Sequence, residues 1–308
     1  ICTCLVGSEM CIRDSSSIDK KPAKKSPTPP FTTSTLQQEA SRKLGFGVTR
    51  TMSTAQKLYE AGLITYMRTD SVTISNEAKS SIVQKIESKY GEDYVYLRDY
   101  KNKNKSAQEA HEAVRPTDIN IEEITSDYDQ QRLYHLIWKR TISSQMSDAQ
   151  IERTVVNIKS DSYNEFFVAR GEVIKFDGFL RVYNEGTDDE IEEEKGVLPA
   201  LSINENLNLL SISSRESFSR PPSRFTEASL VKKLEELGIG RPATYATTIS
   251  TIQNRGYIAK GVNEGLDRNY NLIEFSKNGI KESQLKEKTG SNKGKLVPVS
   301  YTHLRAHE

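Results

Sequence analysis

The spacing of apolar residues changes twice along this chain, and this change limits the folds open to it. In the first half, apolar residues recur at helical intervals, as Leu133, Leu136 and Ile137 do. Over residues 151–213, β-branched and aromatic residues alternate with polar ones between turn residues, which is typical of strands. Helical spacing returns at Thr226. The pattern predicts a mixed α and β chain in which a β region separates two helical regions.

The same changes predict the domain boundaries. Residues 28–147 are expected to form a mostly helical domain, residues 148–218 a β region that bridges it to the rest, and residues 219–298 the start of a second helical domain. The 308 residues of the chain accommodate two or three domains. Residues 15–27 are rich in Ser, Lys and Pro, a composition that favours an extended linker.

Capping residues, glycines and turn residues set the expected ends of the elements inside these regions. The expected helices are 35–44, 53–61, one that starts at Ser75, 108–115, 129–146, one that starts at Thr226, and 243–254. The expected strands are 63–67, 151–159, 165–174, 179–183, 207–213 and 257–258.

The two ends of the chain do not continue the pattern between them. Residues 1–14 (ICTCLVGSEMCIRD) and 299–308 (VSYTHLRAHE) resemble translated adapter sequence, so we expect neither to belong to the fold. All three cysteines of the chain lie in the first of these segments. Structural disulfides and zinc sites are therefore not expected in the body of the protein, which fits a reducing compartment.

The charge of the chain is unevenly distributed. The formal net charge is +1, but residues 185–195 hold seven acidic residues and one lysine, so the remaining 42 basic and 35 acidic residues give about +7. A basic excess of this size is compatible with a polyanionic partner and with an ordinary solvated surface. No apolar run approaches the roughly 20 residues that cross a bilayer, so a membrane role is not expected.

The first segment with chemical potential is GLITYMRTDS, residues 62–71. Tyr66 and Arg68 are two residues apart, and on an extended strand they would project from the same face. An isolated phenol loses its proton only near pH 10, so a neighbouring guanidinium would help it act as a nucleophile. The same guanidinium could hold a phosphate by paired hydrogen bonds. From spacing alone, a packing pair explains these two residues equally well.

The second segment, QEAHEAVRPTD, covers residues 108–118. On a helix His111 and Arg115 would share a face, which pairs a proton carrier with a fixed cation. A surface histidine and an ordinary arginine are the plain alternative. A metal site that uses His111 and Glu112 is disfavoured, because adjacent residues diverge on a helix.

The third segment, GIGRPATYATTISTIQNR, covers residues 238–255 and predicts two helices joined by a tight glycine turn, a helix-turn-helix-like unit. Arg241 and Thr244 lie at the start of its second helix, where free backbone N–H groups attract phosphate. Arg255 lies at the other end. The glycine spacing of a nucleotide P-loop is absent. A helical hairpin whose Gly and Pro only shape the turn is the plain alternative.

Together the three segments resemble the type IA topoisomerase family of bacterial DNA topoisomerase I. The resemblance runs from PPFTTSTLQQEASRKLGFGVTRTMSTAQKLYEAGLITYMRTDS through QEAHEAVRPTD to RFTEASLVKKLEELGIGRPATYATTISTIQNRGYI, in the order of the family. It covers nearly all of residues 28–298. The form ITYMRTDS is more similar to the supercoil-relaxing enzymes than to the decatenating ones. Gln37 and Gln38 also match a family motif, without an assigned role.

The resemblance implies a function and a set of site residues. Tyr66 would attack a DNA phosphate and form a covalent bond to the 5′ phosphate of a cleaved single strand, with Arg68 holding that phosphate. Because the bond energy is conserved, relaxation of negatively supercoiled DNA would need no ATP. The expected DNA-binding residues are His111, Arg115, Arg241, Thr244 and Arg255.

The resemblance also implies an architecture and its partners. A helical Tyr-bearing domain, a β bridging region and a helical strand-binding region would form an arch around a hole for DNA. The protein would act as a monomer on a single-stranded segment of DNA in the cytoplasm, associated with the nucleoid. The family uses Mg²⁺ held by an amino-terminal acidic domain, and nothing before Lys20 matches that domain. The chain is therefore expected to be a fragment that holds no metal and is inactive alone.

Two other classes remain open at this point. A non-cleaving helix-turn-helix protein would fit the basic excess and residues 238–255 equally well. A tyrosine recombinase would also use a tyrosine, but it joins to the 3′ phosphate of the strand.

Overall fold

The computed structural model describes residues 15–101, 111–159, 166–184, 202–203, 210–276 and 279–299. The predicted mixture of helices and strands is confirmed. The predictions for residues 1–14 lie outside the described residues, as do those for the acidic run 185–195 and for all of the carboxy-terminal segment except Val299.

Four α-helices build the first half of the protein. Each begins where a side chain can accept the free N–H groups of the first turn: Thr32, Ser75 and Asp127 cap three of them, and Thr32 forms a capping box with Thr35. The helices are α1 (Thr33–Leu44), α2 (Val48–Glu60), α3 (Asn76–Tyr90) and α4 (Tyr128–Ser144), with a short 3₁₀ helix, η1 (Glu92–Tyr94), after α3.

The core of this helical region centres on α4. Trp138 is 2% exposed, and its indole N–H donates to the carbonyl oxygen of Ile119 at 2.8 Å. Arg140 is also buried, and its guanidinium lies over the rings of Phe31 and Tyr183, at 4.9 and 5.3 Å from their centroids. Tyr183 donates a hydrogen bond to Glu39 of α1. The buried polar groups thus tie α1 and α4 to the chain that returns from the β region.

A three-stranded antiparallel sheet in the order β1-β2-β3 combines the first strand of the chain with two strands that follow α4. Its strands are β1 (Ser15–Lys25), β2 (Ala149–Lys159) and β3 (Phe166–Phe176). The predicted linker at residues 15–27 is therefore wrong over residues 15–25. The Ser, Lys and Pro of this segment suggested a linker, and no local pattern indicates the strand, because its pairing partner β2 lies far away in sequence. Pro22 is tolerated because β1 is at the edge of the sheet.

The second sheet is also antiparallel and has the order β4-β6-β7. It contains β4 (Ser211–Arg215) and a long hairpin of β6 (Leu266–Ser276) and β7 (Gly279–Thr289), while β5 (Ile258–Lys260) pairs with β8 (Leu296–Pro298). The helices α5 (Glu227–Glu236) and α6 (Tyr245–Asn254) confirm the predicted helical pair. The helical description of residues 219–298 fails after Asn254, because strands β5 to β8 follow.

Two shorter predictions also differ from the structure. Residues 179–183 were expected to be a strand, but residues 178–181 form a 3₁₀ helix, η2 (Gly178–Arg181). Gly178 permits this with a φ of 49°, where an added Cβ would lie 2.5 Å from the carbonyl oxygen of Ser147. Residues 63–67 form a bent segment with one isolated bridge, Ile64 to Pro116, instead of a strand.

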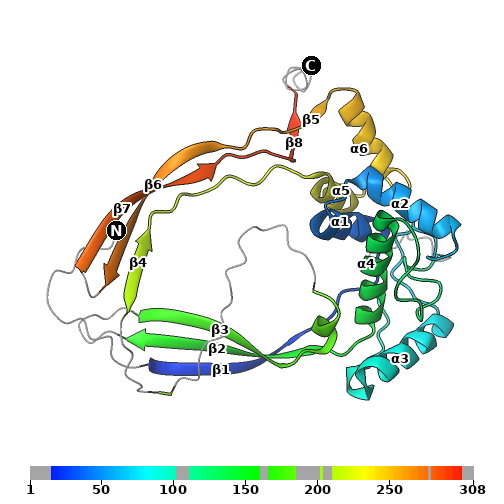
Figure 1. Cartoon of the computed structure of the whole chain (residues 1–308), viewed down its shortest axis with the longest axis horizontal. Helices are drawn as coiled ribbons and strands as arrows, with labels where there is room; N and C mark the ends of the chain where they lie inside the picture. Colours follow the sequence, from blue (N-terminus) through cyan, green and yellow to red (C-terminus); the bar gives the residue numbers. More distant parts are fainter. Residues whose placement is uncertain are drawn as a thin grey trace.

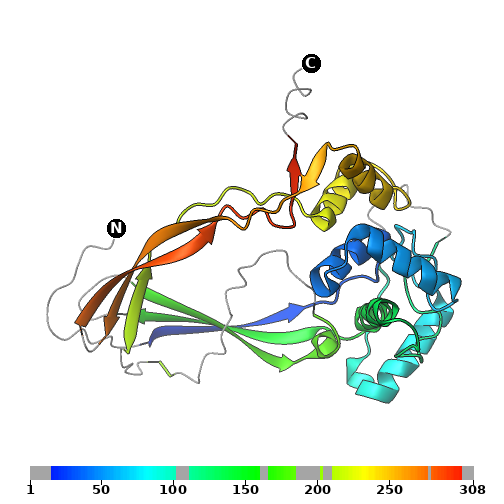
Figure 2. The ribbon, with the colours of Figure 1, turned by 45° about the horizontal axis from the view of Figure 1, so that its top comes forward.

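The elements follow a ring-like course (Figure 1). The sheet β1-β2-β3 leads away from the helices, and the sheet β4-β6-β7 lies at the far end. From this far sheet, β4 is connected to α5, and the hairpin of β6 and β7 is connected to β5 and β8 beside α6. The turned view keeps the same order, with α5 and α6 beside α1 and α2 (Figure 2). The arrangement brings residues from the two ends of the described chain together at the helical end.

Candidate functional site

Tyr66 lies on the segment that joins α2 to α3. Its neighbours Ile64 and Met67 are 1% and 0% exposed, whereas Tyr66 itself is 37% exposed. The backbone on either side is fixed: the N–H of Thr65 donates to the carbonyl oxygen of Arg115 at 2.9 Å, and Thr33 Oγ1 donates to the carbonyl oxygen of Met67 at 2.7 Å. Buried neighbours and backbone hydrogen bonds therefore hold an exposed phenol in a defined position.

Two aromatic side chains flank the Tyr66 ring. Tyr59 of α2 packs edge-on against it, with 5.4 Å between ring centroids, and His111 lies on another side at 5.7 Å. The Tyr66 hydroxyl forms no hydrogen bond with any residue that the structure describes. Packing thus holds the Tyr66 ring, while no hydrogen bond to a described residue engages its hydroxyl oxygen.

Arg68 points away from the core toward the turn before α6. Its side chain is half-buried, and Nη1 lies 3.5 Å from the carbonyl oxygen of Ala243. The expected strand that would place Tyr66 and Arg68 on one face does not form, and within the described residues no hydrogen bond joins them. The Arg68 guanidinium instead connects the Tyr66 segment to the turn that precedes α6.

The helix predicted over residues 108–115 is wrong for the part that is described, residues 111–115. The N–H of Val114 donates to the carbonyl oxygen of Phe31 at 2.8 Å, and the N–H of Ala113 donates to that of Thr73 at 2.9 Å. These partners lie far away in sequence and take the place of a helical ladder. His111 reaches Tyr66 because this extended segment runs beside it, not because of helical spacing.

Arg115 is engaged inside the fold. Its Nε and Nη2 donate to Glu112 Oε2 at 3.1 and 2.5 Å, and its Nη1 donates to the carbonyl oxygen of Pro116 at 2.9 Å. Burial alone would raise the pKa of Glu112, but hydrogen bonds from Ser75 and the charge of Arg115 outweigh it and hold the pKa below its ordinary value. The Glu112 carboxylate thus fixes Arg115 beside the Tyr66 segment.

Arg241, Thr244 and Arg255 mark the two ends of α6. Thr244 Oγ1 accepts from the N–H of Arg241 at 2.9 Å, which closes the turn before the helix. Arg241 and Arg255 are exposed, and no ion pair to a described residue holds either guanidinium. The ten residues of α6 span about 15 Å, and the two cations lie beyond its opposite ends, Arg241 in the turn before the helix and Arg255 at its C-cap.

Helices α5 and α6 pack directly on the Tyr-bearing helices. Val48 of α2 shares a small buried cluster with Val231, Tyr245 and Ile249 of α5 and α6. Thr49 Oγ1 and Ser250 Oγ lie 3.1 Å apart at the edge of this contact. The contact is what brings the start of α6 to Arg68.

One carboxylate, Glu227 of α5, organises the polar side of the contact. Helix α2 begins after Gly47, which has no side chain to cap it, and Glu227 Oε2 accepts the N–H of Val48 at 3.1 Å in its place. Lys260 Nζ and Gln253 Nε2 lie 2.8 and 3.1 Å from Glu227 Oε1. Burial would raise the pKa of Glu227, but these hydrogen-bond donors and the charge of Lys260 lower it overall.

Sequence reasoning missed Glu227 and Tyr59. Glu227 follows the cap residue Thr226, so it reads as an ordinary acid in the first turn of its own helix. The glycine before α2 was the available signal, because a helix that begins after glycine lacks a side-chain cap. Tyr59 lies near the end of α2, and it is 40% exposed beside Tyr66.

Comparison with known proteins decides the family. The family model described as DNA topoisomerase matches residues 12–288. The chain belongs to this DNA topoisomerase family. The match takes in Tyr66, Arg68, the α5–α6 pair, the sheet β1-β2-β3 and all but the last residue of the sheet β4-β6-β7.

Three similar proteins show how far the likeness to this topoisomerase family extends. DNA topoisomerase 1 of Rickettsia felis is 50% identical over 258 residues, which cover 79% of this chain and 33% of the relative. The prokaryotic-type DNA topoisomerase 1 of Acanthamoeba polyphaga mimivirus is 44% identical, covering 92% of this chain and 36% of the relative. DNA topoisomerase 1 of Streptomyces coelicolor is 49% identical over 255 residues. The chain spans about a third of the length of the curated relatives it matches.

The fold is similar to that of a solved topoisomerase. Full-length topoisomerase I of Thermotoga maritima matches with a TM-score of 0.62 and 37% identity, over 82% of this chain and 42% of that chain. The predicted type IA topoisomerase-like fold is thereby confirmed. Among the described residues, no three His, Cys, Asp or Glu side chains are grouped so that they could hold a metal ion. In the same residues, no helix is long and apolar enough to span a membrane.

Proposed function

We propose that this chain is the strand-cleaving part of a type IA DNA topoisomerase and that Tyr66 is its nucleophile. The proposal rests on one observation above all: the Tyr66 phenol is exposed between the buried residues Ile64 and Met67. Arg68, two residues further on, extends to the turn before α6. The family match supports this reading. The motif around Tyr66 and the subtype resemblance favour relaxation of negatively supercoiled DNA over decatenation.

The proposed step is a transesterification. The Tyr66 oxygen bonds to the phosphorus of a single strand, the bond from phosphorus to the 3′ oxygen breaks, and the proton of the phenol ends on that 3′ oxygen. The product is a 5′-phosphotyrosine and a free 3′ hydroxyl. One phosphodiester replaces another, so the reverse step reseals the strand without ATP.

Each remaining site residue has a proposed role at this phosphate or along the strand. Arg68 holds the scissile phosphate and stabilises the charge that develops on it. Arg241, Thr244 and Arg255 contact the strand backbone along α6, where exposed cations and free N–H groups favour phosphate. His111 and Arg115 support the Tyr66 segment and the adjoining DNA.

The rest of the proposal concerns the whole protein. It acts in the cytoplasm on nucleoid DNA, as a monomer, and passes a strand through the ring that the elements follow in Figure 1. The relaxation cycle uses Mg²⁺, which is held outside the described residues. This chain alone therefore cleaves and relaxes poorly, and a supercoil relaxation assay that shows robust activity would contradict this part.

The decisive experiment traps the covalent adduct. A single strand labelled at its 3′ end, and in parallel one labelled at its 5′ end, is incubated with the chain, Mg²⁺ and the remaining parts of the Rickettsia felis relative in trans, and the mixture is then denatured. A 5′-phosphotyrosine retains the 3′ label on the protein, and a 3′-phosphotyrosine retains the 5′ label. Adduct is expected with the chain as it is and with the matched control Tyr59→Phe, and none with Tyr66→Phe. Adduct on the 3′ phosphate would favour a recombinase, and no adduct with any protein would favour a helix-turn-helix protein that binds DNA without cutting it.

A further inference from the structure

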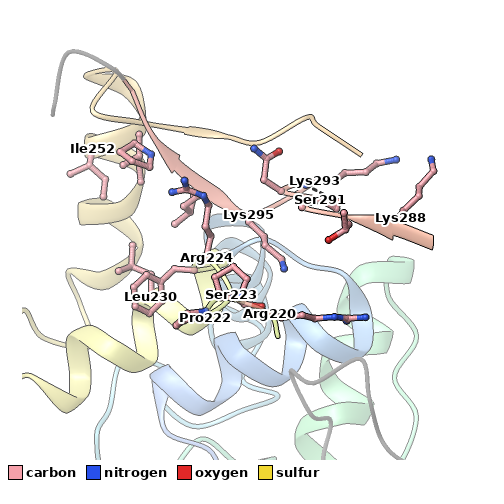
Figure 3. A pocket seen from close by; sticks show the side chains of 18 residues that line it. Arg220, Pro222, Ser223, Arg224, Leu230, Ile252, Lys288, Ser291, Lys293 and Lys295 are labelled. Carbon is pink, nitrogen blue, oxygen red and sulfur yellow. Dashed lines mark hydrogen bonds between the residues drawn. The ribbon is translucent and has the colours of Figure 1, made fainter. Parts of the chain in front are cut away.

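An open pocket of about 1090 Å³ lies apart from Tyr66, between the segment that enters α5 and the loop that precedes β8 (Figure 3). One wall is residues 220–225 and the other is residues 288–298. Leu230 of α5 and Ile252 of α6 close its inner end. The pocket shares no lining residue with the surroundings of Tyr66.

The two walls are tied together by backbone hydrogen bonds. The N–H of Leu296 donates to the carbonyl oxygen of Phe225 at 2.6 Å, which joins one wall to the other. In the loop, Asn292 Oδ1 accepts the N–H of Asn263 at 2.9 Å. Gly261 is required there, because an added Cβ would lie 2.3 Å from the carbonyl oxygen of Asn292. The pocket is thus built into the fold before any ligand arrives.

The lining of the pocket has one sign of charge. It includes five cations and no carboxylate among its described residues: Arg220, Arg224, Lys288, Lys293 and Lys295. Lys288 and Lys293 are paired with Glu264, at 3.4 and 2.7 Å. Arg224 and Lys295 make no ion pair with any described residue. These two cations therefore remain available to an anionic ligand.

An aromatic ring stands beside these cations. Phe225 lines the pocket with 44% of its surface exposed, and its carbonyl oxygen is held by the N–H of Leu296. Cations that follow a phosphate backbone, with an aromatic face for the bases, are the features by which proteins hold single strands without reading their sequence.

We propose that this pocket is a second binding site for single-stranded DNA, with phosphates on Arg224 and Lys295 and a base stacked on Phe225. The proposal rests on the proposed function, because it takes DNA as the substrate. The site binds the strand and does not cleave it. It lies where the segment before α5 and the loop before β8 meet, on the side of α5 and α6 that leads to the sheet β4-β6-β7 (Figure 1). A strand held there is anchored at a point separate from the cleavage site.

The test measures binding of fluorescein-labelled dT12 to the full chain by fluorescence anisotropy over a range of salt concentrations. The double variant Arg224→Ala/Lys295→Ala is expected to weaken binding about tenfold or more at 0.1 M salt, and to make the slope of log K against log salt shallower by about 1.4. The matched control Arg170→Ala/Lys281→Ala removes two exposed cations of β3 and β7 and is expected to change affinity less than twofold.

Stacking is tested separately with Phe225→Leu, which keeps an apolar side chain. This variant is expected to weaken binding of dT12 about fivefold or more, while binding of an abasic strand of equal length stays unchanged. If the alanine double variant proves unfolded by circular dichroism, Arg224→Lys/Lys295→Arg keeps the charges and should bind like the unchanged chain, and Phe225→Leu carries the test.

The outcomes separate this proposal from the function. Tyr66→Phe is expected to bind dT12 normally while it forms no covalent adduct. Unchanged affinity in a folded Arg224→Ala/Lys295→Ala variant, or an equal loss in the control variant, would overturn the pocket proposal even if Tyr66 forms its adduct. A missing adduct together with weakened binding in the pocket variants would overturn the cleavage chemistry and leave the pocket proposal standing.

Discussion

The helical end and the sheet β4-β6-β7 are built on different physical principles. In the helical end, one continuous core buries large side chains such as Trp138, Tyr134 and Phe31 almost completely. In β6 and β7 no residue is buried, and apolar side chains such as Leu285 stay exposed. One region is therefore stabilised by burial of side chains, and the other mainly by its ladder of backbone hydrogen bonds.

The difference predicts where each region is sensitive to substitution. Side chains should dominate in the helical end, because removal of a buried group costs its transfer free energy and leaves a cavity. In the sheet, backbone conformation should dominate, because few side chains there have lost their contact with water. Four substitutions test this contrast, and they are given from the largest expected effect to the smallest.

Trp138→Ala should have the largest effect. It removes a side chain that is 2% exposed and leaves the carbonyl oxygen of Ile119 without its donor. We expect the free energy of unfolding to fall by about 3–5 kcal/mol, as measured by urea denaturation followed by circular dichroism. Tyr128→Ala on the same helix is the matched control, because Tyr128 is 71% exposed. Equal effects of the two would remove the contrast between buried and exposed side chains.

Glu227→Gln should come second, because Glu227 joins α5 to the first turn of α2. Loss of its charge weakens the hydrogen bonds with Val48 N–H and Lys260, so we expect a loss of about 1–3 kcal/mol. Amide hydrogen exchange at Val48 should become faster. Glu236→Gln, an exposed acid on the same helix, is the control and should have little effect. Unchanged exchange at Val48 would show that Glu227 does not cap α2.

The lowered pKa of Glu227 gives this contact a pH dependence of known sign. Its stabilising contribution is present above the ordinary glutamate pKa of about 4.3, and it is lost as the pH falls through the lower pKa of the folded state. Below pH 4 the unchanged chain should therefore lose stability more steeply than Glu227→Gln. Parallel curves for the two proteins would contradict this assignment.

Gly265→Ala should be the most damaging single change in the sheet region. Gly265 has a φ of 98°, and an added Cβ would lie 2.6 Å from the carbonyl oxygen of Thr289. We expect a cost of about 1–3 kcal/mol, seen as faster amide exchange in β6 and β7. Gly290→Ala is the control: its φ is 71°, but nothing lies within 4 Å of the added Cβ. If both cost the same, strain alone and not the close approach sets the effect.

Leu285→Ser should have the smallest effect. Leu285 is 41% exposed on β7, so its replacement by a polar residue should change the free energy of unfolding by no more than about 0.5 kcal/mol. Urea denaturation measures this change. A cost comparable with that of Trp138→Ala would mean that this face of the sheet is covered, and the comparison between the two regions would fail.

The same contrast explains what could be predicted from the sequence. Helices α1 to α6 carry their own signals, namely apolar spacing within the element and caps at its ends, and all six were predicted. The start of α2 was predicted five residues late, at residue 53 instead of Val48, because Gly47 gives no side-chain cap that marks it. Strand β1 and the extended segment at residues 111–115 depend on partners far away, such as Asn157 for Ser17 and Phe31 for Val114. No local pattern reveals such partners, so the sequence suggested a linker and a helix there.

In the candidate site, too, local sequence motifs could be predicted and contacts between distant segments could not. Tyr66 and Arg68 were identified because their motif is local. The ring of His111 beside Tyr66, and the carbonyl oxygen of Ala243 near Arg68, depend on tertiary packing. The roles of these residues in chemistry stay predictions until the adduct experiment is done.

The pairing of β1 with β2 has a mechanical consequence for the helical end. The chain enters that region from Lys25 and leaves it at Ala149, and these two residues are directly paired partners on adjacent strands. The entry to the Tyr-bearing helices and the exit from them are thus held side by side by the backbone ladder of β1 and β2, while β3 leads back to the same helices through η2, whose Phe179 belongs to their core. Shear between β1 and β2 would break this ladder of hydrogen bonds, whereas bending of the sheet across its face would keep it. Movement of the Tyr-bearing helices relative to the far sheet is therefore expected to follow the bending of β1-β2-β3.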